Sequence, residues 1–237
     1  MNAPPPDQPS SPPEDSPDRM VAPRYLAGFD GDVGTDPLSE AGWRAFTDER
    51  GFIRHHAPDH SRCLVLLPPD FATPFGGLHR MWHFWGRNGA AGAPAWNAAF
   101  TSTCPPEIIA AFAEQLADPP PLADGKWGDG LEPLADAGWD RRDVGRLVTY
   151  YAPAGQVVVR FAPAPFHAAD HELPDIVARR VGAQLGPHRP ALWLAKFSAT
   201  TPAYLVNAFC TALADPEPLP RYEADIDDTV RPYLHLT

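Results

Sequence analysis

The 237-residue sequence has few cysteines, no long apolar run and none of the common catalytic motifs. Cys63, Cys104 and Cys210 are too few and too scattered for a disulfide framework, and an odd number of cysteines favours a reducing compartment. No segment approaches the ~18 consecutive apolar residues of a membrane-spanning helix, and the first residues lack the apolar core of a signal peptide. We therefore expect a cytoplasmic protein with no membrane partner.

Enzyme signatures are missing as well. The sequence contains no G-x-S-x-G, H-E-x-x-H or C-x-x-C, no P-loop and no dinucleotide fingerprint. Asp30 and Asp32 have the wrong spacing for a phosphatase or a calcium loop and indicate a turn. His167 and His171 lack a third zinc ligand, and Cys104 stands where a helix N-cap is expected. We therefore predict a protein that is not an enzyme, with no catalytic residue, metal or cofactor.

Proline and acidic residues are abundant but unevenly placed. Seven of the 31 prolines lie in residues 1–20, among Ser, Asp and Glu, which predicts a disordered acidic tail. The net charge is −11, and residues 215–237 contain two Arg against six Asp and Glu, whereas residues 141–214 contain eight Lys and Arg against four acids. The net charge argues against a general nucleic-acid binder, but it leaves room for a local basic face in the second half of the chain.

Two stretches of the chain occur twice. PAWNAAFTSTCPPEIIAAFAEQLADP (94–119) is matched by PALWLAKFSATTPAYLVNAFCTALADP (190–216), and DPLSEAGW (36–43) is matched by EPLADAGW (132–139). In both pairs the second copy follows the first by nearly the same number of residues. The sequence is therefore a tandem duplication of a module of about 95 residues.

Each module has the pattern of four strands followed by one helix. We expect strands over 51–58, 62–69, 78–86 and 95–102, and again over 146–153, 156–163, 175–183 and 192–199. Pro105 and Pro202 suit the first turn of the closing helices, with Cys104 and Thr201 as N-caps. The predicted fold class is α+β: two ββββα repeats with antiparallel sheets, related by an approximate two-fold axis.

The combination of VAPRYLAG (21–28), PL..AGW and PAW..F...P.E.I.A....L.DP resembles the DUF317 family of Streptomyces and related actinobacteria, in two tandem copies. This resemblance implies no activity and no site residues. A doubled ββββα unit is also similar in topology to PUR repeats and whirly proteins, which bind single-stranded nucleic acid. The resulting domain organisation is a tail over 1–20, a first repeat over 21–119, a linker over 120–131, a second repeat over 132–216 and an acidic C-terminal tail over 217–237.

Basic and aromatic residues on the predicted sheets are the remaining functional candidates. Arginines among exposed aromatic rings can contact phosphates while the rings stack on bases. Core packing of the rings and plain solvation of the arginines are the competing interpretations. The candidate nucleic-acid-binding residues are Arg146, Tyr150, Arg160, Arg179, Arg180, Arg189 and Lys196 in the second repeat, with Arg80 and Trp82 in the first.

We therefore predict non-enzymatic binding of nucleic acid, with DNA, single- or double-stranded, as the leading ligand. The alternative is a protein-interaction or assembly module that uses the same sheet or an edge strand together with its acidic tails. A homo-oligomer is compatible with both functions.

Overall fold

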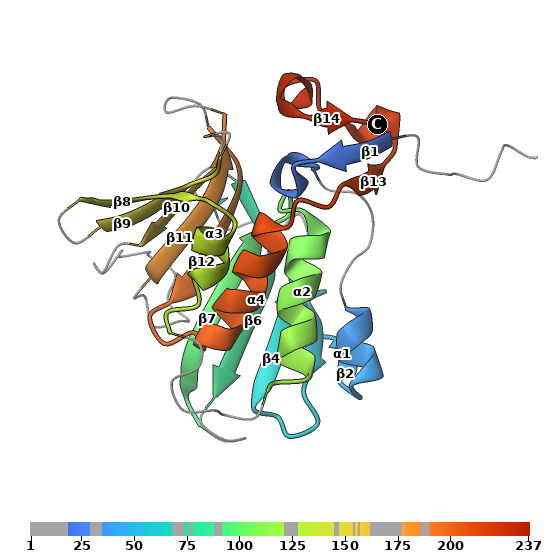
Figure 1. The fold of residues 1–237 in the computed structure, drawn as a ribbon. Coiled ribbons are helices and arrows are strands. Elements are labelled where there is room, and N and C mark those ends of the chain that lie inside the picture. The colour runs from blue at the N-terminus through green and yellow to red at the C-terminus, as the bar shows by residue number, and fades with distance from the viewer. Residues whose placement is uncertain are drawn as a thin grey trace, which may run out of the picture.

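The computed structural model describes residues 19–28, 35–67, 74–75, 78–87, 92–120, 128–144, 147–153, 155, 157–161, 177–185 and 190–237. These residues form an eleven-stranded sheet and a separate three-stranded sheet. Figure 1 shows helices against one side of the large sheet and the small sheet above them. The fold is mixed α+β with antiparallel strand pairs, as the sequence predicts.

The large sheet contains strands from both repeats. Its order is β2-β3-β4-β6-β7-β12-β11-β10-β9-β8, and the short β5 pairs with β6. The first repeat contributes β2 (Arg44–Thr47), β3 (Ile53–His56), β4 (Arg62–Leu66), β5 (Pro74–Phe75), β6 (Leu78–Arg87) and β7 (Pro94–Thr101). The second contributes β8 (Asp140–Val144), β9 (Leu147–Tyr151), β10 (Val157–Phe161), β11 (Val177–Gln184) and β12 (Ala191–Ser198). The two repeats therefore share one continuous sheet, with one repeat on each side of the β7–β12 pair.

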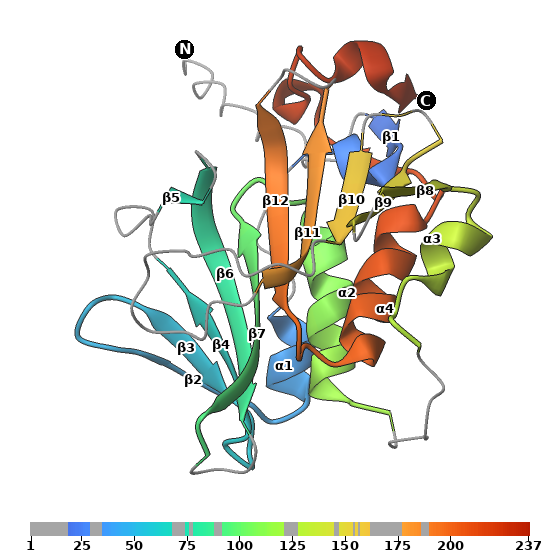
Figure 2. The ribbon, with the colours of Figure 1, turned by 90° about the vertical axis from the view of Figure 1, so that its left-hand side faces the viewer.

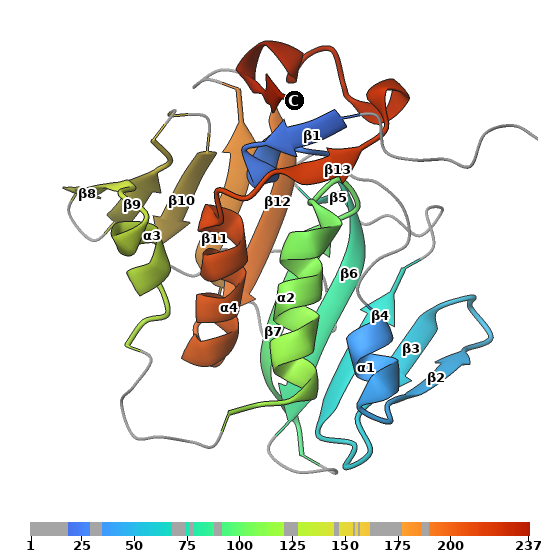
Figure 3. The same cartoon turned by 45° about the vertical axis from the view of Figure 1, so that its right-hand side comes forward.

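The described residues form four α-helices, two from each repeat. They are α1 (Asp36–Glu40) and α2 (Pro106–Ala117), and then α3 (Glu132–Asp136) and α4 (Ala203–Ala214). Figure 3 shows α2 and α4 side by side in front of the central strands. Trp96, Ala98 and Phe100 are buried as their alternate spacing predicts, and so is the repeating apolar stripe of α2 and α4.

The pairing of β7 with β12 has two-fold symmetry. Ala98 lies opposite Phe197, and Phe100 lies opposite Ala195. Because α2 and α4 begin 97 residues apart, at Pro106 and Ala203, Ala195 is the equivalent of Ala98 and Phe197 is the equivalent of Phe100. Exchanging the two repeats leaves this register unchanged.

Hydrogen bonds beside this seam repeat in the same way. Thr103 Oγ1 donates to the Leu192 carbonyl, and its equivalent Thr200 Oγ1 donates to the Ala95 carbonyl. The rings of Phe100 and Phe197 meet edge to face between them, with centroids 5.7 Å apart. One chain thus folds as two similar halves joined through a symmetric strand pair.

The small sheet joins the two ends of the described chain. It consists of β13 (Leu219–Arg221), β1 (Arg19–Ala22) and β14 (His235–Leu236), in that order. Short 3₁₀ helices, η1 (Arg24–Leu26), η3 (Glu223–Asp225) and η4 (Arg231–Tyr233), accompany it. Residues 217–237, expected from the sequence as an acidic tail, are therefore part of the folded body.

Several local features differ from the sequence expectation. Each repeat has one extra strand, β2 or β8, and one extra short helix, α1 or α3, before its ββββα unit. Pro105 and Pro202 are themselves the N-cap residues, and neither cap is made by a side chain. The Thr201 hydroxyl donates instead to the Asn97 carbonyl, so this side chain strengthens the seam rather than the helix end.

Candidate functional site

The helices and the strands carry opposite charge. Within the described elements, the four α-helices contain no Lys or Arg and six acidic residues: Asp36, Glu40, Glu107, Glu114, Glu132 and Asp136. The strands from β2 to β12 contain only Asp140 and Asp143 as acids, against eleven Lys and Arg: Arg44, Arg54, Arg62, Arg80, Arg87, Arg141, Arg142, Arg160, Arg179, Arg180 and Lys196. The sheet is therefore a basic layer in a chain whose net charge is −11.

Strand pairing decides which of these positions share a face. Residues directly opposite each other on neighbouring strands lie on the same side of the sheet, and successive residues along a strand alternate sides. Phe84, Phe100 and Phe197 face the helices, because their rings contact the ring of Phe112 in α2. The residues next to these phenylalanines along each strand, and the residues paired with those neighbours on adjacent strands, lie on the side away from α2 and α4. We call this side the outer face; Figure 2 views the sheet with α2 and α4 behind it.

One cross-strand row on the outer face is rich in cations. It passes through ten strands and reads Phe46, Arg54, Val65, His83, Ala99, Lys196, Arg180, Arg160, Thr149 and Arg142. Five of these positions are Arg or Lys, and none is acidic. With strands about 4.8 Å apart, the row is about 43 Å long. We call it the basic row.

The basic row has an unequal distribution of charge between the repeats. On the first-repeat side of the symmetric Ala99–Lys196 pair, the row contains one Arg. On the second-repeat side it contains Lys196 and three Arg, the last of which is Arg142. The structure gives Arg160 and Arg180 by their backbone positions alone. The second-repeat half of the row is therefore the more basic half.

The two ends of the basic row are accessible to solvent. Arg142 lies over the Tyr151 ring at 4.6 Å and donates to Asp140 at 2.8 Å, with 63% of its side chain exposed. At the other end Phe46 is 49% exposed, and the neighbouring Arg54, with 28% of its side chain exposed, donates to Asp48 at 2.8 Å. Ion pairs this close to solvent contribute little to stability. Between the ends, Val65, Ala99 and Thr149 are buried.

The structure separates the predicted binding residues into three groups. Arg160, Arg180 and Lys196 share the basic row. Arg179 pairs with Phe197 and Phe161, which places it in a row on the helix side. Arg80 is a backbone position in β6, next to an irregularity in the register, and Arg146 and Arg189 lie outside the described residues.

The expectation that Trp82 and Tyr150 offer exposed rings is wrong. Trp82 is 2% exposed and Tyr150 is 4% exposed, and both pair into helix-side rows. An aromatic ring buried in the core has no face on which a base could stack. The outer face has other aromatic residues instead: Phe46, His56, Trp85 and Tyr151. The sequence predicts the strands of His56, Trp85 and Tyr151 but not their register, which decides the side that they face, and it does not predict β2, where Phe46 lies.

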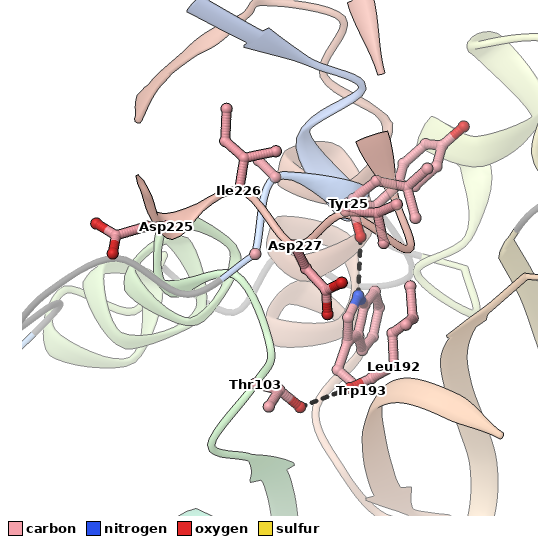
Figure 4. A pocket seen from close by; sticks show the side chains of 11 residues that line it. Tyr25, Thr103, Leu192, Trp193, Asp225, Ile226 and Asp227 are labelled. Carbon is pink, nitrogen blue, oxygen red and sulfur yellow. Dashed lines mark hydrogen bonds between the residues drawn. The ribbon is translucent and has the colours of Figure 1, made fainter. Parts of the chain in front are cut away.

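In the part of the chain that the structure describes, the helical side offers no comparable site for an anion. A groove of about 540 Å³ between α2 and α4 is lined by Glu114, Asp118 and Asp215, with Arg24 held by Asp215 at 2.8 Å. A smaller cavity of about 170 Å³ lies under the C-terminal segment, where Trp193 Nε1 donates to the Tyr25 carbonyl (Figure 4). This volume is below the roughly 300 Å³ from which small-molecule pockets usually start.

Cys63 and His56 are neighbours on the outer face. The Cys63 sulfur lies 3.6 Å from His56 Nε2, which is the arrangement of a Cys–His pair. Burial raises the pKa of Cys63 to about 12, so the thiol stays protonated and is a poor nucleophile. Among the described residues no three His, Cys, Asp or Glu side chains gather as a metal site, and no helix is both long and apolar enough to cross a bilayer.

The fold defines a class: an α+β protein of two tandem repeats that share one antiparallel sheet. The family model of SPDY, a domain of unknown function (DUF317), matches residues 56–122 and 152–219. The chain belongs to the DUF317 family and contains two copies of its domain, as its sequence resemblance indicated. No curated protein and no solved structure matches the chain.

The matched ranges help to sort the candidate residues. They include β4, β6, β7 and α2 in the first copy and β10, β11, β12 and α4 in the second. Lys196, Arg160 and Arg180 lie inside these ranges, whereas Phe46, Arg54 and Arg142 lie outside them.

Proposed function

We propose that this protein binds nucleic acid through the outer face of its large sheet, with phosphates along the basic row. The observation that carries the proposal is the separation of charge. The strands of the large sheet hold 11 of the chain's 19 Lys and Arg, and five of these cations share one cross-strand row without an acid. Each phosphate neutralised by Arg or Lys releases counterions, which makes such binding favourable and dependent on salt.

The separation of charge also explains how an acidic protein can bind a polyanion. The six acids of the α-helices lie in the layer behind the sheet, and Glu223 of η3, beside the three-stranded sheet, is ion-paired with Arg19 and Arg231. Fields from these acids are screened over about 8 Å at physiological salt, so the basic row dominates the potential close to its own surface. The acids on the other layer disfavour binding in any other orientation.

The likeness of a doubled ββββα unit to PUR repeats and whirly proteins belongs to the same proposal. It is a likeness of topology, and each repeat here has an extra strand and a short helix. Fold alone does not carry function, so the proposal depends on the row and not on this likeness.

The experiment that tests the proposal uses two neighbouring residues of β11. Fluorescence anisotropy measures binding of labelled 20-nucleotide single strands and duplexes at 25–300 mM KCl. Arg180→Ala removes a cation from the basic row, and Arg179→Ala removes one from the helix-side row of the same strand. We expect Arg180→Ala and Lys196→Ala each to weaken binding several-fold and to lower the slope of log K against log salt by about 0.7–0.9.

Arg179→Ala serves as the matched control and should leave affinity and slope close to those of the wild type. The thermal midpoint of each variant confirms that the fold is intact. The absence of measurable binding by wild type at 25 mM KCl would rule out the proposed function, as would equal losses in the Arg179 and Arg180 variants.

A second candidate function, protein docking at the edge strand β2, is favoured by one observation. All four β2 residues are exposed, and Phe46 and Ile53 of the β2–β3 hairpin are 49% and 41% exposed. The opposite edge, β8, is protected by its own Arg141–Asp143 and Arg142–Asp140 pairs. Ile53→Lys on the helix side tests this function, because it blocks a docked strand and leaves the basic row unchanged. Loss of association in light scattering, with unchanged nucleic-acid affinity, would favour docking.

A further inference from the structure

The outer face differs between the two repeats at the ends of the basic row. At the end of the basic row the first repeat has Phe46, and the equivalent position of the second repeat is Arg142. In the neighbouring row the first repeat has His56 and Trp85 on β3 and β6. We call Phe46, His56 and Trp85 the aromatic patch. The first-repeat end of the outer face is therefore richer in aromatic rings than the second-repeat end, where Tyr151 lies beside Arg142.

The rings of the aromatic patch contact one another in sequence. Phe46 and His56 are stacked, with centroids 5.3 Å apart and an interplanar angle of 21°. His56 meets Trp85 edge to face at 6.4 Å and 83°. The patch crosses the sheet from the edge strand β2 to β6, which are joined through β3 and β4. Phe46 is one of the four large apolar side chains that are exposed in the described part of the chain.

Cations surround the aromatic patch. The Arg87 guanidinium carbon lies 4.4 Å from the centroid of a Trp85 ring, and Arg54 lies 5.8 Å from that of Phe52. Arg44 pairs with His56 and is exposed. Exposing an aromatic ring to water is unfavourable. A nucleotide base that stacks on the ring buries its apolar surface, and the phosphate of that nucleotide lies near the surrounding arginines.

A duplex cannot use the aromatic patch. Its bases are stacked on one another inside the helix, and it offers a protein surface its phosphates, sugars and base edges. Unpaired bases have free faces, and stacking on an aromatic side chain is worth enough to change affinity by about 5- to 100-fold per base. The basic row alone would accept either form, so the aromatic patch is the feature that separates them.

We infer that the aromatic patch is a stacking platform for unpaired bases and that the ligand of the outer face is single-stranded nucleic acid. The strand's bases stack on the first repeat, and its phosphates continue over Lys196 and the arginines of the second repeat. This inference rests on the proposed function and assigns its ligand class.

The test compares two exposed apolar residues on opposite sides of one hairpin. Phe46→Ala removes a ring of the aromatic patch, whereas Ile53→Ala removes an exposed side chain from the helix side. Phe46→Tyr keeps a ring and serves as the rescue. Anisotropy is measured with a labelled 20-nucleotide single strand and with its duplex, at 50 mM KCl, and size-exclusion chromatography gives the oligomeric state of each variant.

We expect wild type to prefer the single strand to the duplex by at least tenfold. Phe46→Ala should weaken single-strand binding about tenfold with an unchanged salt slope, while duplex binding, Ile53→Ala and Phe46→Tyr stay close to wild type. An unchanged salt slope distinguishes lost stacking from lost phosphate contacts. Trp85 also packs with Phe52, Cys63 and Val65, so its substitution disturbs this cluster as well as the patch. It is therefore tested after Phe46.

Three results would overturn the inference and leave the proposed function standing. The first is equal affinity for single strand and duplex, and the second is an equal effect of Phe46→Ala and Ile53→Ala. A change of oligomeric state in Phe46→Ala, with unchanged affinity, would assign the ring to a contact between copies of the chain and would also overturn it. Failure of wild type to bind either form would remove both the inference and the proposed function.

Discussion

Arg221 donates two hydrogen bonds to the Glu107 carboxylate, one from each terminal nitrogen, and both are 2.8 Å long. The Arg221 side chain is 2% exposed, and its Nε also donates to the Ala27 carbonyl. Glu107 lies in the first turn of α2, where a negative charge is favoured by the helix dipole. One buried guanidinium thus ties β13 and the N-terminal segment to the main body.

Replacing Arg221 should be strongly destabilising. Arg221→Ala leaves the Glu107 carboxylate and the backbone carbonyls of Ala27, Gly28 and Pro220 without this donor. We expect the free energy of unfolding to fall by about 3–5 kcal/mol. Arg231→Ala is the control, because its ion pair with Glu223 is accessible to solvent and is worth at most about 1 kcal/mol. Urea denaturation followed by tryptophan fluorescence measures both, and similar losses would contradict the role given to Arg221.

Phe100 is expected to be the most sensitive position of the seam. Its ring lies within 6 Å, centroid to centroid, of four others: Phe84, Phe112, Phe197 and Phe209. Phe100→Ala should lower the free energy of unfolding by about 3–5 kcal/mol, since the cavity left by a fully buried ring is surrounded by rings from both repeats. Phe46→Ala, at an exposed ring, should cost less than about 1 kcal/mol. Guanidinium denaturation of both variants checks the difference.

The central strands and the long helices could be predicted because their signals are local. Trp96, Ala98 and Phe100 alternate along one strand, and the same spacing recurs around Phe197, so both the element type and the buried side follow from the sequence. The duplication strengthened each assignment, because two diverged copies keep the positions that pack against a helix.

The joining of the repeats could not be predicted in this way. One continuous sheet requires Ala99 and Lys196 to be paired across the seam, and no local pattern specifies a partner so distant in the chain. The edge strands β2 and β8 lack apolar alternation, because RAFT is exposed throughout and DRRDV is mostly charged. Charge alone identified the basic second half, but the side of the sheet on which Arg179 and Arg180 lie follows only from register.

The three thiols should be unreactive in the native protein. Cys63, Cys104 and Cys210 are free and buried, and burial raises the pKa of Cys63 and of Cys104, so little thiolate exists near neutral pH. With an aromatic disulfide reagent at pH 8, we expect no fast reaction in buffer and the rapid reaction of all three cysteines in 6 M guanidinium. If one thiol per protein molecule reacts fast in the native state, at least one cysteine is accessible. The Cys63–His56 pair would then again be a candidate reactive site.

Stability should fall as the pH drops below about 6.5, through histidines that are held neutral. Burial lowers the pKa of His55 below its ordinary value of 6.5. Burial also lowers the pKa of His56, helped by the positive charges of His60, Arg54 and Arg87. Below pH 6.5 the unfolded chain therefore binds protons that the folded chain does not, and acidification favours unfolding.

The histidines and the carboxylates change the stability of the protein in different pH ranges. The pKa of Asp59 is lowered by hydrogen bonds from Ser61, so its contribution is lost only in more acid solution, below its ordinary value of 3.8. Between pH 8 and 6.5 we expect nearly constant stability, and between pH 6.5 and 5 a fall of up to about 1.4 kcal/mol per pH unit for each histidine. His55→Gln should reduce that slope by its own share, whereas His235→Gln, at an exposed position of β14, should leave it unchanged. Urea denaturation at half-unit pH intervals measures the slope, and an equal slope in wild type and His55→Gln would assign the pH dependence to other groups.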